Sequence, residues 1–326
     1  DAGNTAQEFY TNRTVVQLMA EILQPQPDES IYDPTCGSGG MLVKCLDYLR
    51  NKGEEWQGVH VYGQEINGLT ASIARMNLYL NGVEDFSIAC ADTLSSPAFT
   101  EGSKLKTFDV VLANPPYSIK EWNRAAFEHD KWGRNFLGTP PEGRADYAFI
   151  QHIIKSMDEK HGKCAILLPH GILFRKEEQE MRRKLVESNK IECIVGLGPN
   201  LFYNSPMEAC VLICNNHKRD ELFNKILYIN AVDEVTRKNG ESFLEDKHIK
   251  AIKDSYFKLL NKEKFSRIVP YKEIEGNDFD LSIQKYIFRN QVISEGIRTF
   301  DEEYVDWDRD QKQLNKNLEA FIALLS

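Results

Sequence analysis

Apolar residues along the chain alternate between two spacings. Short continuous runs, among them HVYGQEI (60–66), FSIACAD (86–92) and FDVVLA (108–113), predict buried strands, because both faces of such a strand meet apolar neighbours. Between these runs lie stretches such as 70–82, in which apolar residues recur at helical spacing. The alternation predicts an α/β fold around a mostly parallel sheet. The runs at 209–216 and 225–231 have short connections, which predicts an antiparallel edge there.

Each of four successive predicted strands ends in a polar side chain. In chain order these are Asp33, Glu65, Asp92 and Asn114. The carboxyl ends of parallel strands share one edge of a sheet, and ligands of open α/β folds bind at that edge. A single acidic residue there could also be a helix N-cap, above all Asp92. Four polar residues in register are harder to explain as caps, and they predict a ligand site in which Glu65 is placed to bind ribose hydroxyls.

A glycine-rich loop follows the first of these strand ends, in the segment DPTCGSGG (33–40). Strand, glycine turn and helix in that order let bare backbone approach a ligand beneath a helix N-terminus. The spacing matches neither the G-x-G-x-x-G fingerprint nor the P-loop, so a phosphate site is not favoured. Asp33 instead indicates a ligand with a cationic end. The alternative is a tight connection without a ligand.

The fourth strand end opens the segment Asn114-Pro115-Pro116-Tyr117. The two prolines fix two φ angles, remove two backbone donors and push Asn114 out of the α region, which makes the turn stiff. A stiff turn holds the amide carbonyl of Asn114 and the flat ring of Tyr117 in fixed places. This pair suits the binding of a planar group that carries an NH₂. The alternative is an ordinary strand-end turn.

A long polar loop, residues 118–145, follows directly. Its aromatic and cationic side chains are interleaved, as in rims that bind the phosphates and unstacked bases of nucleic acids. An ordinary surface loop is the alternative. The side chains concerned are Lys120, Trp122, Arg124, Lys131, Trp132, Arg134 and Arg144.

Composition narrows the classes of protein that fit. The 326 residues carry a net charge of −9, which is the wrong sign for gripping duplex DNA by phosphate contacts alone. No apolar run approaches the roughly 20 residues of a membrane span, and the first residues lack the order of a signal peptide, so a cytoplasmic protein is expected. The seven cysteines lie mostly in apolar runs without a CxxC pair, which predicts neither disulfides nor a metal site.

The composition shifts toward charge near residue 232. We therefore predict a main domain over residues 1–231 and a C-terminal extension over residues 232–326. The extension ends in an amphipathic helix that either docks on the core or meets a partner. The apolar stripe of this helix comprises Leu314, Leu318, Phe321, Ile322 and Leu325.

With DPTCGSGG and NPPY on successive strand ends, the chain resembles the amino-methyltransferases that use S-adenosylmethionine. It resembles most closely the modification subunits of type I restriction-modification systems, which methylate adenine N6 in DNA. The resemblance runs from about Phe9 to Ile287. It implies a class I, Rossmann-like methyltransferase fold with a seven-stranded, mostly parallel sheet, an antiparallel edge and a C-terminal helical extension. It also implies that residues 1–231 form the methyltransferase catalytic domain and that the family's usual N-terminal helical domain is absent.

The resemblance implies roles for individual residues. Two departures from the family pattern are Asn12, where proline is expected, and Pro206-Met207-Glu208 in the loop after Leu201-Phe202-Tyr203. The implied catalytic residues are Asn114, Pro115, Pro116 and Tyr117. The implied cofactor-binding residues are Glu8, Phe9, Tyr10, Thr11, Asn12, Arg13, Asp33, Thr35, Gly37, Ser38, Gly39, Gly40, Glu65, Ile66, Asp92, Thr93 and Leu94.

The function that the resemblance implies is transfer of a methyl group from S-adenosylmethionine to adenine N6 of duplex DNA after base flipping. A specificity subunit, a restriction subunit and a second modification subunit are the implied partners, with the terminal helix as the expected contact. Three alternatives stay open at this point. The NH₂ could belong to cytosine N4 or to a protein glutamine, and the fold could serve assembly as a cofactor-binding scaffold without turnover.

Overall fold

A computed structural model describes residues 12–117, 119–199, 201, 208–238 and 241–287. These residues belong to one compact unit that ends at Ile287. The predicted amphipathic helix near the C-terminus lies outside the described residues. No helix in the described ranges is long and apolar enough to cross a membrane.

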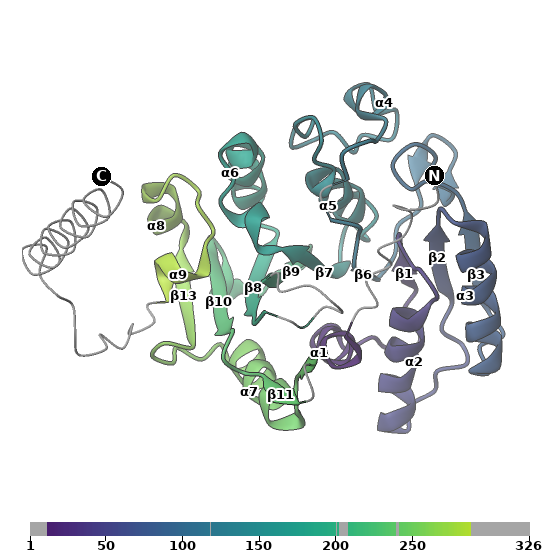
Figure 1. Ribbon diagram of the computed structural model, residues 1–326, viewed down its shortest axis with the longest axis horizontal. Helices are drawn as coiled ribbons and strands as arrows, with labels where there is room; N and C mark the ends of the chain where they lie inside the picture. Colours follow the sequence, from purple (N-terminus) through teal and green to yellow (C-terminus); the bar gives the residue numbers. More distant parts are fainter. Residues whose placement is uncertain (1–11, 118, 200, 202–207, 239–240, 288–326) are drawn as a thin grey trace, which may run out of the picture. The chain divides into compact units, whose positions relative to one another are not determined.

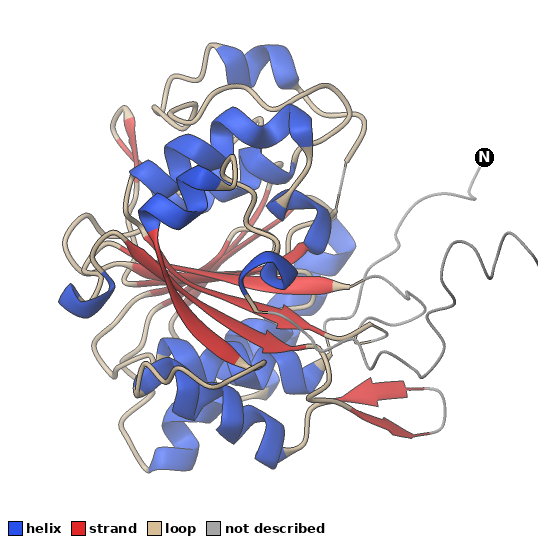
Figure 2. Ribbon diagram, turned by 90° about the vertical axis from the view of Figure 1, so that its left-hand side faces the viewer, coloured by secondary structure: helices blue, strands red, loops and turns tan. Residues whose placement is uncertain are grey.

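A sheet of nine strands runs through the described part of the chain (Figures 1 and 2). Its spatial order is β13-β10-β8-β9-β7-β6-β1-β2-β3. The strands are β1 Ile31–Asp33, β2 Val61–Glu65, β3 Phe86–Cys90, β6 Val110–Ala113, β7 Lys163–Pro169, β8 Ile191–Leu197, β9 Ala209–Asn215, β10 Lys225–Ala231 and β13 Ser266–Pro270. Two short hairpins accompany the sheet, β4 Thr100–Glu101 with β5 Lys104–Leu105 and β11 Thr236–Lys238 with β12 Glu241–Phe243.

The directions of the strands confirm the predicted α/β class with a mostly parallel sheet. Strands β7, β6, β1, β2 and β3 are parallel neighbours, and β10 is parallel to β8. The antiparallel strands are β9, which lies inside the sheet between β7 and β8, and β13, which forms an edge. The predicted antiparallel edge at 209–231 is thus displaced: β9 is internal and β10 is parallel to its inner neighbour.

The sheet exceeds the predicted seven strands because β10 and β13 extend it beyond β8. Strand β13 was not expected, since its apolar run is only Ile268 and Val269 between Arg267 and Pro270. Pairing with the buried strand β10 stabilises a segment that has little strand character of its own.

Helices cover both faces of the sheet (Figure 2). One face carries α1 Arg13–Leu23, α2 Gly40–Lys52, α3 Gly68–Leu80 and α7 Asp246–Phe257. The other carries α4 Arg124–Glu128, α5 Asp146–Lys155, α6 Gln179–Glu187, α8 Tyr271–Gly276 and α9 Ile283–Tyr286. Short 3-10 turns follow β7 and β9, namely η1 His170–Leu173, η2 Lys176–Glu178 and η3 Asp220–Leu222.

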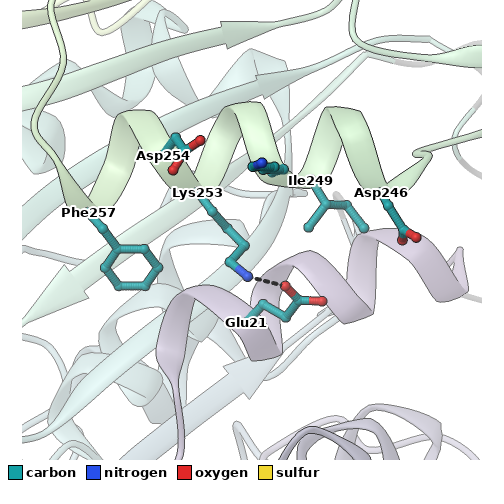
Figure 3. A pocket seen from close by; sticks show the side chains of 7 residues that line it. Glu21, Asp246, Ile249, Lys253, Asp254 and Phe257 are labelled. Carbon is teal, nitrogen blue, oxygen red and sulfur yellow. Dashed lines mark hydrogen bonds and ion pairs between the residues drawn. The ribbon is translucent and has the colours of Figure 1, made fainter. Parts of the chain in front are cut away.

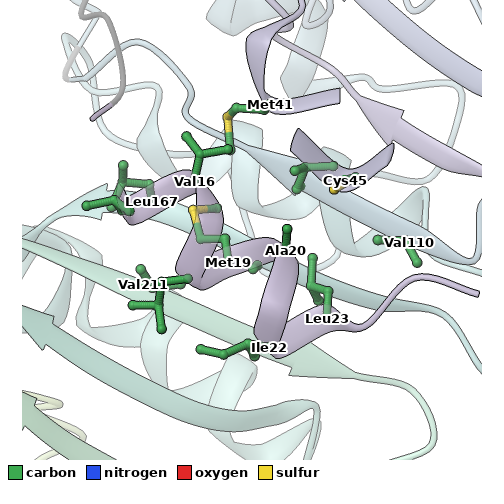
Figure 4. Packing of buried hydrophobic residues seen from close by; sticks show 14 of the residues in the cluster. Val16, Met19, Ala20, Ile22, Leu23, Met41, Cys45, Val110, Leu167 and Val211 are labelled. Atoms are coloured by element: carbon green, nitrogen blue, oxygen red, sulfur yellow. The ribbon is translucent and has the colours of Figure 1, made fainter. Parts of the chain in front are cut away.

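The side-chain alternation of the central strands builds one hydrophobic core on each face. In β6, Val110 and Leu112 pack with α1 and α2, whereas Val111 and Ala113 pack with α5. Figure 4 shows the first core, where the apolar face of α1 lies over the sheet and beside α2. The N-cap of helix α1 is Asn12, whose side-chain oxygen accepts from the Thr14 N–H at 3.0 Å.

Residues 232–287 are part of the same compact unit as the sheet. Strand β13 pairs with β10, and α7 lies against α1. Lys253 of α7 and Glu21 of α1 form an ion pair in a groove between the two helices (Figure 3). The predicted domain boundary after residue 231 therefore falls inside this unit, and the shift toward charge marks a polar surface of the domain. None of the predicted site residues lines the groove.

Candidate active site

The four polar strand ends lie on four neighbouring parallel strands. Because the sheet order is β6-β1-β2-β3, the order across its carboxyl edge is Asn114, Asp33, Glu65 and Asp92. The parallel register places Asp33 of β1 opposite Gly63 of β2. The sequence therefore predicted correctly that these residues share one edge, which is where ligands of open α/β folds bind.

The glycine loop forms an open cradle above the start of α2. Gly37 and Gly39 have φ values of +52° and +78°, a region that L side chains rarely adopt. A Cβ on Gly37 or Gly40 would meet no atom of the described residues within 4 Å, so these residues leave room beside the two glycines. The N-cap of α2 is Gly39, which offers no side-chain hydrogen bond. The N-terminal N–H groups of α2 are thus left for a ligand.

We call the four strand-end residues Asn114, Asp33, Glu65 and Asp92 the row. Asp33 is its most unusual side chain. It is fully buried, its Oδ1 accepts from the Thr35 N–H at 2.9 Å, and its Oδ2 has no hydrogen-bond partner among the residues that the structure describes. Burial, with a smaller contribution from the nearby Glu65, raises the pKa of Asp33 to about 7 against the hydrogen bonds from Thr35. A buried carboxyl oxygen without a partner costs free energy, which a cationic ligand group at Oδ2 would recover.

Glu65 and Asp92, at the next two strand ends, accept hydrogen bonds from backbone N–H groups of nearby loops. Glu65 accepts from the Gly37 N–H at 3.1 Å through Oε2 and from the Asn67 N–H at 2.8 Å through Oε1. Asp92 accepts from the Leu94 N–H at 2.9 Å. The Thr93 hydroxyl donates to the Pro34 carbonyl and ties the third loop to the first. Each carboxylate keeps lone pairs for a ligand, because a carboxylate accepts about four hydrogen bonds.

The Asn-Pro-Pro-Tyr turn follows β6 directly. The Tyr117 hydroxyl donates to the Asn114 Oδ1 at 2.9 Å, and both side chains are half-buried. Pro115 is buried and Pro116 is exposed. Burial raises the pKa of Tyr117 well above its ordinary value, so its hydroxyl stays protonated and remains a donor near neutral pH. The turn therefore fixes an amide oxygen and an aromatic ring beside Asp33.

Some of the predicted cofactor-binding residues lie outside the described part of the chain, and others have contacts elsewhere in the protein. Glu8, Phe9, Tyr10 and Thr11 lie outside the described residues, as does the loop 202–207. Asn12 uses its side chain within the protein, since its oxygen caps α1 and its nitrogen donates to the Ser242 carbonyl at 2.7 Å. Arg13 is exposed at the start of α1.

The prediction that the loop 118–145 forms a nucleic-acid rim is wrong for Arg134. Of its seven side chains proposed for a nucleic-acid rim, Lys120 and Lys131 are exposed, whereas Arg134 is 1% exposed. Its guanidinium donates to Asp130 and to the carbonyls of Thr93 and Leu94. Arg134 therefore anchors the loop to the protein and is not available to phosphates. The sequence pattern missed this residue because a lone arginine in a polar loop is usually exposed.

Gln64 is a second residue that the sequence analysis missed. It is fully buried in β2, and its side-chain nitrogen donates to the carbonyls of Ala91 and Ser96 at 3.1 and 3.0 Å. Its oxygen accepts from the Ala98 N–H at 3.0 Å. A glutamine next to the acidic end of an apolar strand is the signal that could have identified it, since a buried amide needs partners.

This sheet order with its carboxyl-edge row defines a class I S-adenosylmethionine-dependent methyltransferase fold. The chain belongs to the N-6 DNA methylase family, whose model matches residues 1–295. The sequence-based resemblance is thereby confirmed.

Known proteins similar to this chain agree with that family. The methylase subunit of the type I restriction enzyme MjaVII from Methanocaldococcus jannaschii is 33% identical over 324 residues, which cover 94% of this chain and 54% of that protein. The crystal structure of a type I restriction-modification methyltransferase subunit from Streptococcus thermophilus matches with a TM-score of 0.78 and 33% identity, over 86% of this chain and 60% of that one. A Listeria monocytogenes protein described as a class I S-adenosylmethionine-dependent methyltransferase shares the fold, with a TM-score of 0.55 and 21% identity over 74% of this chain and 68% of that one.

The chain spans about half the length of the curated relatives it matches, 54% and 49% of two methylase subunits from M. jannaschii.

Proposed function

We propose that this chain carries the catalytic core of a type I modification subunit, which transfers a methyl group from S-adenosylmethionine to N6 of adenine in DNA. The observation that carries the proposal is the position of the Asn114–Tyr117 turn on β6, directly beside Asp33 at the end of β1. A group that holds a planar NH₂ and a group that seeks a cation lie on neighbouring strands. Family membership and the identity of the relatives support adenine in DNA as the target.

The residues of the row fit the cofactor. Asp33 would hold the ammonium of its methionine part through Oδ2, which has no partner among the described residues, and the glycine loop at Gly37 and Gly40 would accept that part at the start of α2. Glu65 would bind the ribose hydroxyls, and the turn Asp92–Leu94, together with Ile66, would bind the adenine. Bound there, S-adenosylmethionine supplies a methyl group that its sulfonium already activates.

The Asn-Pro-Pro-Tyr turn orients the target nitrogen. An exocyclic adenine NH₂ is a poor nucleophile because its lone pair is delocalised into the ring. Asn114 Oδ1 and the Pro115 carbonyl accept its two hydrogens, which favours pyramidal nitrogen and directs the lone pair toward the methyl donor. The Asn114 oxygen has two lone pairs, so it can keep the bond from Tyr117 and accept one N6 hydrogen.

Tyr117 holds the base by stacking. The target nitrogen is inaccessible inside a duplex, so the adenine must be flipped out at a cost of a few kcal/mol. Stacking of the base on an aromatic ring offsets about 1 to 3 kcal/mol of that cost. Because the chain is acidic, we assign the choice of DNA sequence to a specificity subunit, in a complex with a restriction subunit and a second modification subunit. The cytoplasmic location stays a prediction.

Mass spectrometry of nucleosides and peptides tests the proposal against its rivals. DNA from a host that expresses the full-length subunit with its specificity partner should contain N6-methyladenine that is absent when Asn114 is replaced by alanine. N4-methylcytosine or methylglutamine in its place would assign the same turn to another amide or amino group. Calorimetric cofactor binding without any methylated product would leave only the scaffold role.

A further inference from the structure

An arginine from outside the row holds the backbone of the turn Asp92–Leu94. Arg134 Nη1 donates to the Thr93 carbonyl at 2.9 Å, and Nη2 donates to the Leu94 carbonyl at 2.8 Å. Arg134 belongs to the loop 118–145, about 40 residues further along the chain. Two adjacent carbonyls of one turn are thus fixed by the two arms of one guanidinium.

The guanidinium is held in its orientation from the opposite side. Asp130 Oδ1 accepts from Nε at 2.8 Å and from Nη2 at 2.6 Å, and the Asp130 side chain is completely buried. Nη1 also lies 3.4 Å from Nδ1 of the buried His152. The rings of Phe127 and Trp132 lie 5.3 and 4.8 Å from the guanidinium carbon. Only a planar fork with several fixed donors satisfies all these contacts, so lysine cannot replace arginine here.

Other contacts in and beside this turn come from residues next to the ends of β1 and β2. Gln64 of β2 bonds the carbonyls of Ala91 and Ser96, and the Thr93 hydroxyl bonds Pro34. The Thr93 and Leu94 carbonyls are the part of the turn that these contacts leave to Arg134. A buried ion pair costs desolvation energy, and removing one partner is far more costly than keeping both. A buried pair directed at two backbone carbonyls is well suited to set the shape of the turn.

We propose that Arg134 is a positioning residue for the adenine end of the cofactor: it fixes the turn Asp92–Leu94 from the loop that follows the catalytic turn. This inference rests on the proposed function, which assigns that turn to the adenine. The consequence is that the loop 118–145 and the cofactor site share one structural element. Loss of Arg134 then weakens ligands in proportion to their adenosine part and leaves contacts to the methionine part intact.

Two ligands separate the ends of the site. S-Adenosylhomocysteine has both the adenosine and the amino-acid part, whereas 5′-methylthioadenosine has only the adenosine part. In calorimetry, Arg134→Lys should lower the affinity for both ligands by the same factor, roughly tenfold, which is the effect of losing a charge-assisted hydrogen bond. Asp33→Asn should lower the affinity for S-adenosylhomocysteine alone. Destabilisation of the glycine loop would weaken S-adenosylhomocysteine more than 5′-methylthioadenosine. An equal loss of affinity for both ligands in Arg134→Lys therefore indicates an effect on the adenosine end of the site.

Arg219 offers a matched control far from the row. Its Nε donates to the nearly buried Glu192 at 2.8 Å, its Nη1 donates to the Tyr256 carbonyl at 2.8 Å, and its guanidinium lies 4.6 Å from the Tyr256 ring. Like Arg134 it bonds a buried carboxylate and a backbone carbonyl, near the start of β8 at the amino edge of the sheet, although its side chain is 27% exposed. Arg219→Lys should lower the melting temperature as Arg134→Lys does, yet leave both ligand affinities within twofold of wild type.

The outcomes distinguish this inference from the proposed function. If the wild-type chain binds neither ligand, the proposed function fails. If wild type binds both and folded Arg134→Lys binds both equally well, the positioning role is wrong. If Arg134→Lys does not fold, Asp130→Glu replaces it, because this variant keeps both the guanidinium and a carboxylate partner and changes the geometry of the pair. This variant should lower the affinity for both ligands equally, by less than tenfold, and hydrogen exchange at the turn 92–96 should be faster than in wild type. Unchanged exchange and unchanged affinity would reject the proposal.

Discussion

Asp33 and Glu178 are both buried carboxyl groups, but they differ in whether the protein provides a cation beside them. Asp33 ends β1 and forms no ion pair with any residue in the described ranges, and its Oδ2 has no partner. Glu178 of η2, which follows β7, lies 3.4 Å from the guanidinium of Arg175. The same guanidinium bonds the buried Asp146 at 2.7 Å. Burial raises the pKa of both Asp33 and Glu178 to about 7.

The difference between these carboxyls lies in where the cation comes from. Around Glu178 the fold supplies a cation, because the Arg175 guanidinium lies between Glu178 and Asp146, although Glu178 Oε2, like Asp33 Oδ2, has no hydrogen-bond partner in the described part of the chain. Around Asp33 the fold supplies a hydrogen bond and a glycine loop, but no described residue forms an ion pair with the carboxyl group, and its buried Oδ2 has no partner among the described residues. A perturbed pKa therefore does not identify a binding site by itself, whereas a perturbed pKa beside an open cradle indicates one.

Replacing Asn114 by alanine should have the largest effect, because it removes the acceptor that lies between the two regions. We expect methyl transfer to fall by at least 10²- to 10³-fold, the order measured for loss of one preorganised polar group. The affinity for S-adenosylhomocysteine should stay within about twofold, since Asn114 does not hold the cofactor. Turnover and calorimetry on the same preparation measure the two effects.

Asn123→Ala is the control for this variant. Asn123 lies in the following loop, where its side chain accepts from the Ala126 N–H at 3.1 Å at the start of the short helix α4. Its loss should leave turnover nearly unchanged. Equal losses of turnover and cofactor affinity in Asn114→Ala would place Asn114 in the cofactor site and overturn its assigned role.

Replacing Asp33 by asparagine should have the next largest effect. Loss of a charged contact to the ammonium lowers the affinity for S-adenosylhomocysteine by about 10- to 100-fold. In wild type, ligand binding requires the ionised carboxylate, so affinity should rise about tenfold per pH unit up to about pH 7 and level off above it. Asp33→Asn should show no such slope. Calorimetry between pH 5.5 and 8.5 measures both, and a slope that persists in the variant would assign the proton to another group.

The same variant should be more stable than wild type at alkaline pH. Burial raises the folded pKa of Asp33 from 3.8 to about 7, so the stabilising contribution of the protonated form is fully present below about pH 4 and is lost as the pH rises through about 7. An uncharged amide avoids that loss. Thermal unfolding of the ligand-free protein at pH 8 should show a gain of about 2 to 4 kcal/mol in the free energy of unfolding. Lower stability of Asp33→Asn would mean that the carboxylate has an internal cation.

The sequence predicted the row but not what fixes it. That Asn114, Asp33, Glu65 and Asp92 share one edge follows from alternating strands and helices, because a parallel sheet brings the ends of its strands together. That Asn114 lies next to Asp33 was not predicted, since it results from the crossover that places β6 beside β1. The buried pair of Arg134 and Asp130 could not be predicted, since its partners are backbone carbonyls about 40 residues away and no local pattern marks them. For the same reason β13 was missed: its strand character comes from pairing with β10 rather than from its own residues.

Replacing Tyr117 should separate stacking from hydrogen bonding. Tyr117→Phe keeps the ring and removes the hydroxyl that donates to Asn114 Oδ1, so turnover should fall about three- to tenfold through looser orientation of the amide. Tyr117→Ala also removes the ring, and it should weaken engagement of the flipped base further. The fluorescence of 2-aminopurine at the target position reports base flipping in the complete complex. Identical fluorescence in wild type and Tyr117→Ala would contradict stacking.

Replacing Glu178 by glutamine should have the smallest effect, although its pKa is perturbed as much as that of Asp33. Removing the buried charge of Glu178 raises the free energy of unfolding, whereas losing its contact with Arg175 lowers it. Arg175 keeps its ion pair with Asp146, so we expect the two effects to cancel to within about 1 kcal/mol. The affinity for S-adenosylhomocysteine and its pH slope should match wild type. If Glu178→Gln abolished that slope, the titrating group of the cofactor site would be Glu178, and the contrast between a self-neutralised and an open carboxyl would fail.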